Sequence, residues 1–254
     1  MSAPNPSLRA PTPRDEAWRY ADGDVLKALA PARFENWRDI EVAAGESFCE
    51  CFILEDEAPE LIRLRIKLAE GARAAIFAVN AGGDYARMEI VVRLSTGSHF
   101  EFGGVTIGGG DATREFVTRL AHDEPGATSA QVVRAVHWDH ATGNFLGRID
   151  VVRGAQRTDA AQDFKAVLLS RGASANAKPE LEIFADDVKC AHGAAIGQLD
   201  ETARFYMAAR GIPPESARRL LVQAFIGNAF VALEDDAERE AMLDKALSVL
   251  GNAI

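Results

Sequence analysis

The chain has 254 residues, of which 48% are hydrophobic and 26% charged, an ordinary balance for a globular protein with a sizeable core. Its formal net charge of −10 argues against a nucleic-acid or anionic-membrane partner, because no basic patch is evident that would neutralise phosphates. The chain lacks an apolar run of the roughly 18 residues that span a bilayer, its opening residues are too polar for a signal peptide, and its three cysteines suit a reducing compartment, so we expect a cytoplasmic protein.

Residues 1–39 are expected to form a tail followed by a short helical segment. The stretch up to about Pro13 carries four prolines and few apolar side chains, which is typical of a disordered or loosely held tail. Apolar residues then recur at helical spacing, at Trp18, Val25, Leu26 and Leu29. The Ala-Pro-Ala sequence at residues 30–32 ends this pattern, so we expect one short amphipathic helical segment that stops there.

Residues 40–197 show a different pattern, of short apolar-alternating runs separated by turn residues. The runs are Phe52–Leu54, Leu61–Leu68, Ala74–Val79, Met88–Leu94, His99–Ile107, Glu115–Ala121, Ala130–Trp138, Asn144–Val152 and Phe164–Leu169. They predict an all-β region, because no helix-length periodic stretch intervenes. A sandwich, a barrel and a solenoid all produce such spacing, and the sequence shows no strict internal repeat that would select the solenoid.

Residues 198–254 return to helical spacing and are expected to form a small helical subdomain. The first helix is expected to end near Gly211, a typical C-terminal cap, and Pro213-Pro214 starts a second helix. The Asp235-Asp236 pair opens a third. A helical unit at the end of a β-solenoid can cap strand edges that would otherwise stay unpaired.

The run from Lys178 to Asp200 concentrates the most reactive side chains of the chain. Its alternation of apolar and polar residues predicts a half-buried strand, with a turn at Asp186-Asp187 and a second extended piece from Val188. On an extended strand, Cys190 and His192 point to the same face with their Cα atoms roughly 6.6 Å apart. They could reach one metal or cluster, but two ligands do not close a tetrahedral site, so further ligands must come from elsewhere in the chain or from a partner.

The same run, K-P-E-L-E-I-F-A-D-D-V-K-C-A-H-G-A-A-I-G-Q-L-D, resembles the C-terminal signature of the SufD family, subunits of the SufBCD iron–sulfur cluster assembly complex. Three neighbouring stretches continue the likeness, namely A-Q-R-T-D-A at Ala155–Ala160, L-L-S at Leu168–Ser170 and F-Y-M-A-A-R-G-I-P at Phe205–Pro213. An N-terminal stretch, R-D-E-A-W-R-Y at residues 14–20, is also similar, whereas residues 43–142 match weakly and the N-terminal helical portion is short for the family.

The resemblance implies a mainly β fold, a right-handed parallel β-helix, and a non-catalytic scaffold subunit for iron–sulfur cluster assembly. It implies pairing with SufB through the β-helix and recruitment of the ATPase SufC through the C-terminal helices, from Leu199 to Phe225. It also implies that His192, together with a SufB cysteine, holds the nascent cluster or its iron, with Cys190 as a possible second ligand. A flavin is allowed by the resemblance, and pairing of two copies of this chain remains open.

The main alternative is a β-helix enzyme that cleaves polysaccharides with Asp186 and Asp187 as acid and base and His192 nearby. Adjacent residues on a strand point to opposite faces, so the two carboxylates meet only if the turn folds them together. A saccharide cleft would also need several aromatic stacking platforms, and aromatic residues make up only 7% of the chain. We therefore interpret the aspartates as a turn pair.

Three other motifs have less specific interpretations. Cys49-Glu50-Cys51 places two thiols on one strand face and could bind a soft metal, but we interpret the pair as apolar core filler. The segment from His137 to His140 is interpreted as a surface hairpin or coil corner without a role in chemistry. The glycine-rich stretches lack the order of a phosphate-binding loop, so any ATPase must be another subunit.

Overall fold

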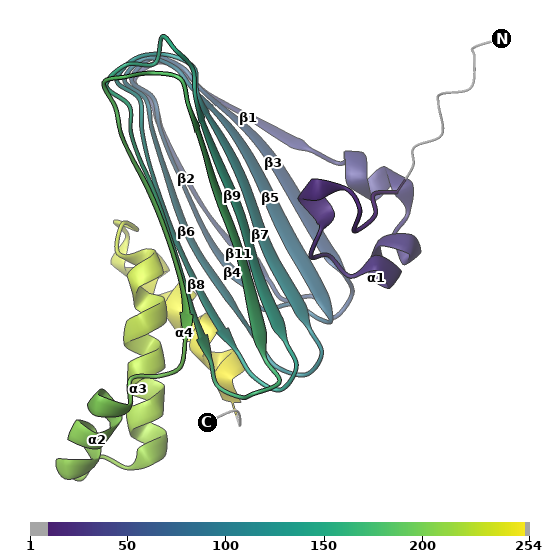
Figure 1. Cartoon of the computed structure of the whole chain (residues 1–254), viewed down its shortest axis with the longest axis vertical. Helices are drawn as coiled ribbons and strands as arrows, with labels where there is room; N and C mark the ends of the chain where they lie inside the picture. The colour runs from purple at the N-terminus through teal and green to yellow at the C-terminus, as the bar shows by residue number, and fades with distance from the viewer. Residues whose placement is uncertain (1–9, 252–254) are drawn as a thin grey trace.

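The computed structural model describes residues 10–251, so residues 1–9 of the expected tail lie outside the described part of the chain. The chain folds into a parallel β-helix, in which two six-stranded parallel sheets face one another and the backbone alternates between them (Figure 1). Short helices stand at the N-terminal end and longer ones at the C-terminal end. The expected fold class is confirmed. Within residues 10–251 we find no helix with the length and apolarity needed to cross a membrane.

The odd-numbered strands form one sheet, sheet A, and the even-numbered strands form the other, sheet B. Sheet A contains, in spatial order, β1 (Arg38–Val42), β3 (Glu60–Leu68), β5 (Tyr85–Leu94), β7 (Thr113–His122), β9 (Thr142–Val151) and β11 (Ser174–Ile183). Sheet B contains β2 (Ser47–Leu54), β4 (Arg73–Asn80), β6 (His99–Gly108), β8 (Thr128–His137), β10 (Asp159–Leu168) and β12 (Lys189–Gly197).

The length of the coil changes along the β-helix. In the first coil Arg38 pairs with Leu64, 26 positions later, whereas in the last coil Thr142 pairs with Ser174, 32 positions later. The spacing of paired residues is therefore larger in the C-terminal coils than in the first ones, because both the strands and some of the corners are longer there. This growth explains why the sequence shows no strict repeat, even though the fold is repetitive.

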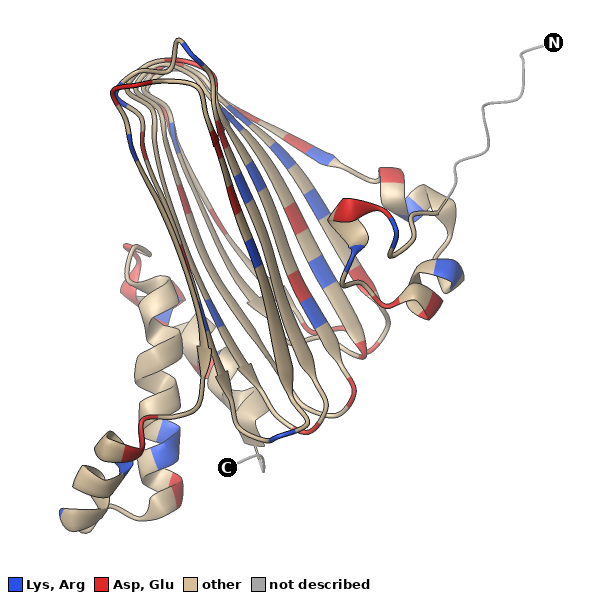
Figure 2. Cartoon of the chain, in the orientation of Figure 1, with Lys and Arg blue, Asp and Glu red and all other residues tan. Residues whose placement is uncertain are grey.

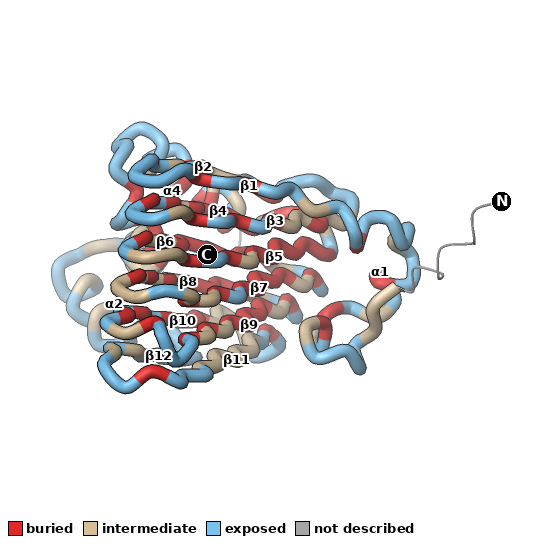
Figure 3. The backbone as a smooth tube through the Cα atoms, turned by 90° about the horizontal axis from the view of Figure 1, so that it is seen from above, coloured by how far each residue is buried: buried red, intermediate tan, exposed pale blue. Residues whose placement is uncertain are grey.

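The space between the sheets is filled by alternate side chains from every strand. Aromatic residues pack in the middle coils, where the rings of Phe102 and Phe116 meet edge to face at 5.3 Å and those of Phe145 and Phe164 stack at 5.7 Å. Fully burying one such ring contributes roughly 1.5–3 kcal/mol. The middle strands are accordingly the most deeply buried part of the molecule (Figure 3).

The N-terminal segment packs on the outer face of sheet A as three short pieces, not as the single helix expected. They are η1 (Glu16–Trp18), α1 (Gly23–Ala28) and η2 (Pro31–Glu35). The Asp22 carboxylate accepts a hydrogen bond from the backbone N–H of Asp24 at 2.8 Å and so caps the start of α1. Because a new helix begins here, η1 and α1 are separate elements. Trp18 lies flat against the buried Arg87 guanidinium at 3.7 Å.

Charged side chains alternate in sign along the outer face of sheet A (Figure 2). Many pair across or along the strands: Arg63 lies 2.9 Å from Glu89 on the neighbouring strand, and Arg148 lies 2.8 Å from Asp150 on its own strand. This pattern explains how a sheet without a covering helix over most of its outer face remains compatible with water.

The C-terminal helices cover the outer face of sheet B. They are α2 (Glu201–Ala209), α3 (Pro214–Gly227), the short η3 (Asn228–Phe230) and α4 (Asp236–Leu250). The predicted helix starts at Pro214 and Asp235 are confirmed. Gly103 permits the close approach, since a Cβ atom there would lie 2.0 Å from the carbonyl oxygen of Ala229. Helix α2 differs from the others because it buries no side chain.

Candidate functional site

The last coil leaves one end of both sheets open. Within residues 10–251, β12 pairs only with β10 and β11 only with β9. Side chains along these two strands are half-buried or exposed, unlike those of the middle coils (Figure 3). An open strand edge carries unpaired backbone N–H and C=O groups that can pair with another strand. This end of the β-helix is therefore suited to contact another protein chain.

Cys190 and His192 both lie on β12, at this open end. The expected extended conformation is confirmed, because β12 runs from Lys189 to Gly197. Cys190 is in register with Ala160 and His192 with Gln162, and both neighbours are buried in the interior. The thiol and the imidazole therefore point to the interior side of the coil, where no further strand covers them. Cys190 is half-buried against the interior cluster, whereas His192 is exposed.

The two side chains differ in how ready they are to bind a metal. Burial raises the pKa of the Cys190 thiol, the nearby Asp159 carboxylate adds to the rise, and a backbone hydrogen bond from Ala160 opposes it. A metal bound to Cys190 would therefore have to displace its proton. The His192 imidazole has neither a hydrogen-bond nor an ion-pair partner among the described residues, so both ring nitrogens are open to a ligand or a partner chain.

The ligand set at this end is incomplete. Among residues 10–251 we find no group of three or more His, Cys, Asp or Glu side chains arranged to hold a metal ion. Cys190 and His192 supply at most two ligands, as the sequence predicts, and a tetrahedral centre needs four. A second chain placed against the open end would be close enough to add the rest.

One buried polar residue beside the site was missed in the sequence. Gln162 is the register neighbour of His192, points inward between the strands, and leaves its Oε1 atom without a partner. Gln131 holds the same position one coil further inside, and both of its amide atoms are also unpaired. Orphaned polar atoms in a core mark places for water or an alternative rotamer. The sequence could have predicted this buried position, because Gln162 lies two residues from both Ala160 and Phe164 and therefore shares their inward strand face.

Asp186 and Asp187 do not join His192. Both are exposed at the corner between β11 and β12, where the backbone bends as the sequence predicts. The backbone N–H of Asp187 donates to Gln156 Oε1 at 2.9 Å, a contact that fixes the corner. Asp187 and His192 lie five positions apart, the first in the bend and the second on β12, and a fully extended chain of that length spans about 16 Å. This geometry does not suit joint acid–base action on one bond.

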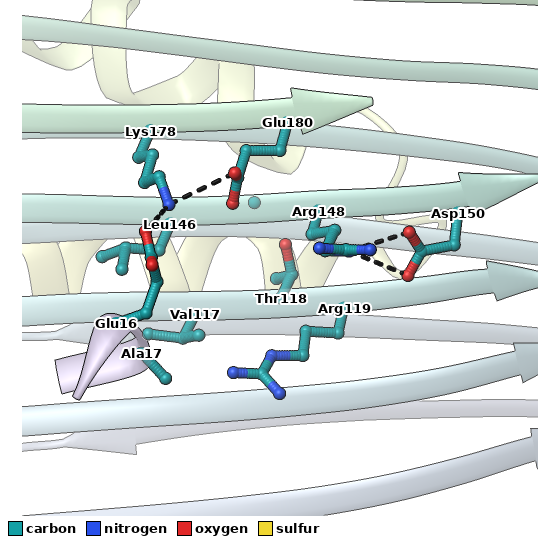
Figure 4. A pocket seen from close by; sticks show the side chains of 11 residues that line it. Glu16, Ala17, Val117, Thr118, Arg119, Leu146, Arg148, Asp150, Lys178 and Glu180 are labelled. Carbon is teal, nitrogen blue, oxygen red and sulfur yellow. Dashed lines mark hydrogen bonds and ion pairs between the residues drawn. The ribbon is translucent and has the colours of Figure 1, made fainter. Parts of the chain in front are cut away.

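A pocket lined by several charged side chains lies elsewhere, between η1 and the outer face of sheet A (Figure 4). Lys178 binds Glu16 and Glu180, and Arg148 binds Asp150, so most of its charges neutralise one another. No aromatic side chain lines it. Such a pocket lacks the stacking platforms of a saccharide cleft.

Helices α2 and α3 expose several large apolar side chains. On α2, Phe205 is 77% exposed and Tyr206 57% exposed, and on α3 Leu220 is 47% exposed. All three lie within the stretch from Leu199 to Phe225 for which a partner contact is predicted. Exposed aromatic side chains on a protruding helix are typical of a protein–protein contact.

The other predicted motifs lie away from His192. His137 is buried inside the β-helix and hydrogen-bonds Thr106, whereas His140 is exposed at a corner, so the two do not form a metal pair. Cys49 and Cys51 lie on β2, at the opposite end of sheet B. Their interpretation as core filler is wrong for Cys49, which is exposed, and incomplete for Cys51, which is half-buried on the outer face.

Comparisons with known proteins agree with the sequence signature. Residues 43–225 match the family model of the SUF system FeS cluster assembly SufBD core domain. The chain is 34% identical over 126 residues to the iron–sulfur cluster assembly protein SufD of Escherichia coli, covering 50% of this chain and 30% of that protein. It is 33% identical over 122 residues to SufD of Bacillus subtilis, covering 48% of this chain and 28% of that protein. It is 42% identical over 117 residues to the chloroplastic protein ABCI7 of Arabidopsis thaliana, covering 45% of this chain and 24% of that protein. Each match thus spans less than a third of the relative's length.

Proposed function

Since the chain belongs to the SufBD core family of the SUF iron–sulfur cluster assembly system, we propose that it is a non-catalytic scaffold subunit that holds an iron–sulfur cluster as cargo between itself and a partner. The observation that carries this proposal is the position of His192, an unpartnered imidazole on the last strand of an open β-helix. The cluster is the substrate of assembly and leaves with an acceptor protein.

An incomplete ligand set suits such a task. A site closed by one chain would retain its metal, whereas a site shared by two chains can release its cargo when their packing changes. His192 would supply one ligand and Cys190, after loss of its proton, a second. The remaining ligands would come from SufB, the partner that the family signature implies, and thiolates are the ligands that iron–sulfur clusters prefer.

The open edges of β11 and β12 support the same partner arrangement. Backbone groups along both strands are free to pair with the edge of another β-helix, and the half-buried side chains between them would become buried. A second copy of this chain presents the same edges, so a homodimer is the alternative occupant. Purification of the chain alone distinguishes these two partners, because a homodimer would form without SufB.

Replacing His192 by Ala is expected to remove the cargo while preserving the complex. The chain would be co-expressed with SufB and SufC without oxygen and the purified complex assayed for iron and sulfide. We expect the variant to keep both partners and to lose most of its iron, since the lost imidazole leaves too few ligands. His140→Ala is the matched control, because it also removes an exposed histidine, at a corner away from β12. Equal iron in both variants would contradict the proposal.

The same preparations test two further expectations. Cys190→Ser reports whether the thiol is a ligand, because a ligand role predicts a further loss of iron. A bound flavin would add its visible absorption to the spectrum. We propose the pocket between β10, β12 and α3, which is lined by Ile196, Leu221, Phe225 and Lys165, as the place of such a flavin.

The exposed aromatic pair of α2 is proposed as part of the contact with the ATPase SufC. The double replacement Phe205→Ala with Tyr206→Ala is expected to weaken SufC binding at least 10-fold without lowering the melting temperature, because neither ring is buried in the isolated chain. Isothermal titration with SufC measures the affinity. Val231→Ala is the control, an exposed apolar residue of the same helical unit outside α2 and α3. Unchanged affinity in the double variant would exclude this surface.

A further inference from the structure

The Cys49-Glu50-Cys51 motif lies beside a surface groove at the first coil of the β-helix, and Cys49 lines that groove. Strand β2 is the edge strand of sheet B at this end, and β12, which carries His192, is the edge strand at the other end. The groove lies between the outer faces of β2, β4 and β6 and the start of α4. Its lining includes Cys49, His99 and Glu238. The proposed cargo site has no part in it.

Both thiols face this groove side of the strand. Phe48 and Phe52 pack against the interior cluster, so the alternation of β2 directs Cys49 and Cys51 outward. The Cys51 thiol donates a hydrogen bond to Glu238 Oε2 at 3.7 Å, a contact that joins β2 to α4. An exposed thiol, a half-buried thiol and an exposed carboxylate, from two different elements, therefore lie on the same side of sheet B.

The surroundings of the two thiols are negative. Glu101, Glu234 and Asp235 line the same groove, and Glu238 is exposed. Burial raises the pKa of Cys51 to about 12, and the Glu238 carboxylate and the neighbouring Cys49 add to the rise. Burial and the carboxylates of Glu238 and Glu234 also raise the pKa of Cys49. Both thiols are therefore protonated when no cation is bound, and the negative charge that attracts a cation comes from the four carboxylates of Glu101, Glu234, Asp235 and Glu238.

The geometry of β2 favours metal binding by Cys49 and Cys51 over a disulfide between them. Side chains two apart on a strand run parallel, with their Cα atoms roughly 6.6 Å apart. A disulfide needs Cβ atoms about 3.5–4.5 Å apart, which would require movement of the backbone. In a tetrahedral centre two metal–sulfur bonds of about 2.3 Å place the sulfur atoms about 3.8 Å apart, which rotation of the thiol side chains towards each other can reach without movement of the backbone.

We propose that Cys49, Cys51 and Glu238 form a second metal site, which takes a thiophilic divalent cation such as Zn²⁺. On binding, each thiol releases its proton to solvent and a metal–sulfur bond replaces a metal–water bond, while the carboxylate supplies a third ligand and water the fourth. No three such side chains within residues 10–251 already stand in ligating geometry, so binding reorients Cys49 and Glu238, which are both exposed. The site anchors α4 to the first coil and is independent of the cargo site.

Cobalt(II), a spectroscopic stand-in for Zn²⁺, tests the site in the full chain without oxygen. Wild type is expected to bind one cobalt ion with a cobalt–thiolate absorption band, and Zn²⁺ is expected to displace it. Cys49→Ser and Cys51→Ser are each expected to weaken binding at least 10-fold, and Glu238→Gln to weaken it less. Because Cys190 is the third thiol, Cys190→Ser is the control and is expected to retain the band.

Two results would overturn the proposal. One is a wild-type chain that shows no cobalt–thiolate band at all. The other is a band that survives Cys49→Ser and Cys51→Ser but disappears in Cys190→Ser, which would assign the metal to the cargo site. Circular dichroism of each variant shows whether it is folded, and Glu238→Gln, a surface change on α4, keeps the test decisive if a cysteine variant does not fold. Loss of iron in His192→Ala with an intact cobalt site separates this inference from the proposed function.

Discussion

Acidification from pH 7 to pH 4.5 is expected to lower the free energy of unfolding of the β-helix by roughly 5 kcal/mol, through two buried histidines. His137 and His122 are fully buried inside the β-helix. Burial, reinforced by the neighbouring Arg114 guanidinium, lowers the pKa of His137 to about 3. Burial lowers the pKa of His122 to about 4, against the weaker effects of a backbone hydrogen bond at Ala127 and the Asp123 carboxylate.

The number of protons bound by the folded and unfolded chains explains why the free energy of unfolding falls as the pH falls. In the unfolded chain both imidazoles become protonated as the pH falls below about 6.5, whereas in the folded chain they stay neutral until about pH 4 and pH 3. The unfolded state therefore binds more protons throughout this interval, so stability is complete above pH 6.5 and is lost as the pH falls. Two pH units below 6.5 correspond to between about 2 and 3 kcal/mol for each histidine.

Urea denaturation at several pH values measures this loss. His137→Gln is expected to flatten the dependence on pH, because glutamine does not titrate and can still bond Thr106, whatever its effect at neutral pH. His140→Gln is the control, since this exposed side chain meets water in both states. A His137→Gln variant with the same slope as the parent chain between pH 6.5 and pH 4.5 would contradict the assignment.

Replacement of Glu115 by Ala is expected to cost about 3–5 kcal/mol, because it removes the nearer of the two carboxylates that pair with the buried Arg87 guanidinium and leaves only Glu89, at 3.5 Å. The Glu115 carboxylate accepts hydrogen bonds from Tyr85 Oη at 2.7 Å, Arg87 Nη1 at 3.2 Å and Asn144 Nδ2 at 3.1 Å. All four side chains are fully buried beneath the N-terminal segment. Burial and the Glu115 carboxylate raise the pKa of Tyr85, so its hydroxyl remains a donor.

Thermal and urea unfolding measure the loss for Glu115→Ala. Since Arg87 also donates to the carbonyl oxygen of Ala17 and stacks on Trp18, we further expect faster proteolysis of the N-terminal segment in this variant. Asp39→Ala is the matched control, because its ion pair with Arg65 is loose, at 3.9 Å, and exposed, and its loss should change stability by less than about 1 kcal/mol. A similar small change in Glu115→Ala would show that the network does not hold the segment.

The candidate site was predicted only in part. The extended conformation around Cys190 and His192 follows from local alternation, and the resemblance to the SufD family identified the fold and the region. The direction of the two side chains could not be predicted, because alternation shows which residues share a face without showing which face is inside. The same limit explains Cys49 and Cys51, which share a strand face as predicted but lie on the outer face of β2, where Cys49 is exposed and Cys51 packs against the cluster beneath the C-terminal helices.

The sequence by itself determined the local elements of this protein, since strand alternation, turn residues and helix caps act over a few residues. It therefore predicts most strands and the helix starts at Pro214 and Asp235. Only the tertiary structure decided which distant residues meet. Tyr85 reaches Glu115, 30 positions away, across neighbouring strands of sheet A. Such pairings depend on corners whose lengths vary from coil to coil, so that register, burial and the open end at His192 emerge only when the coils stack.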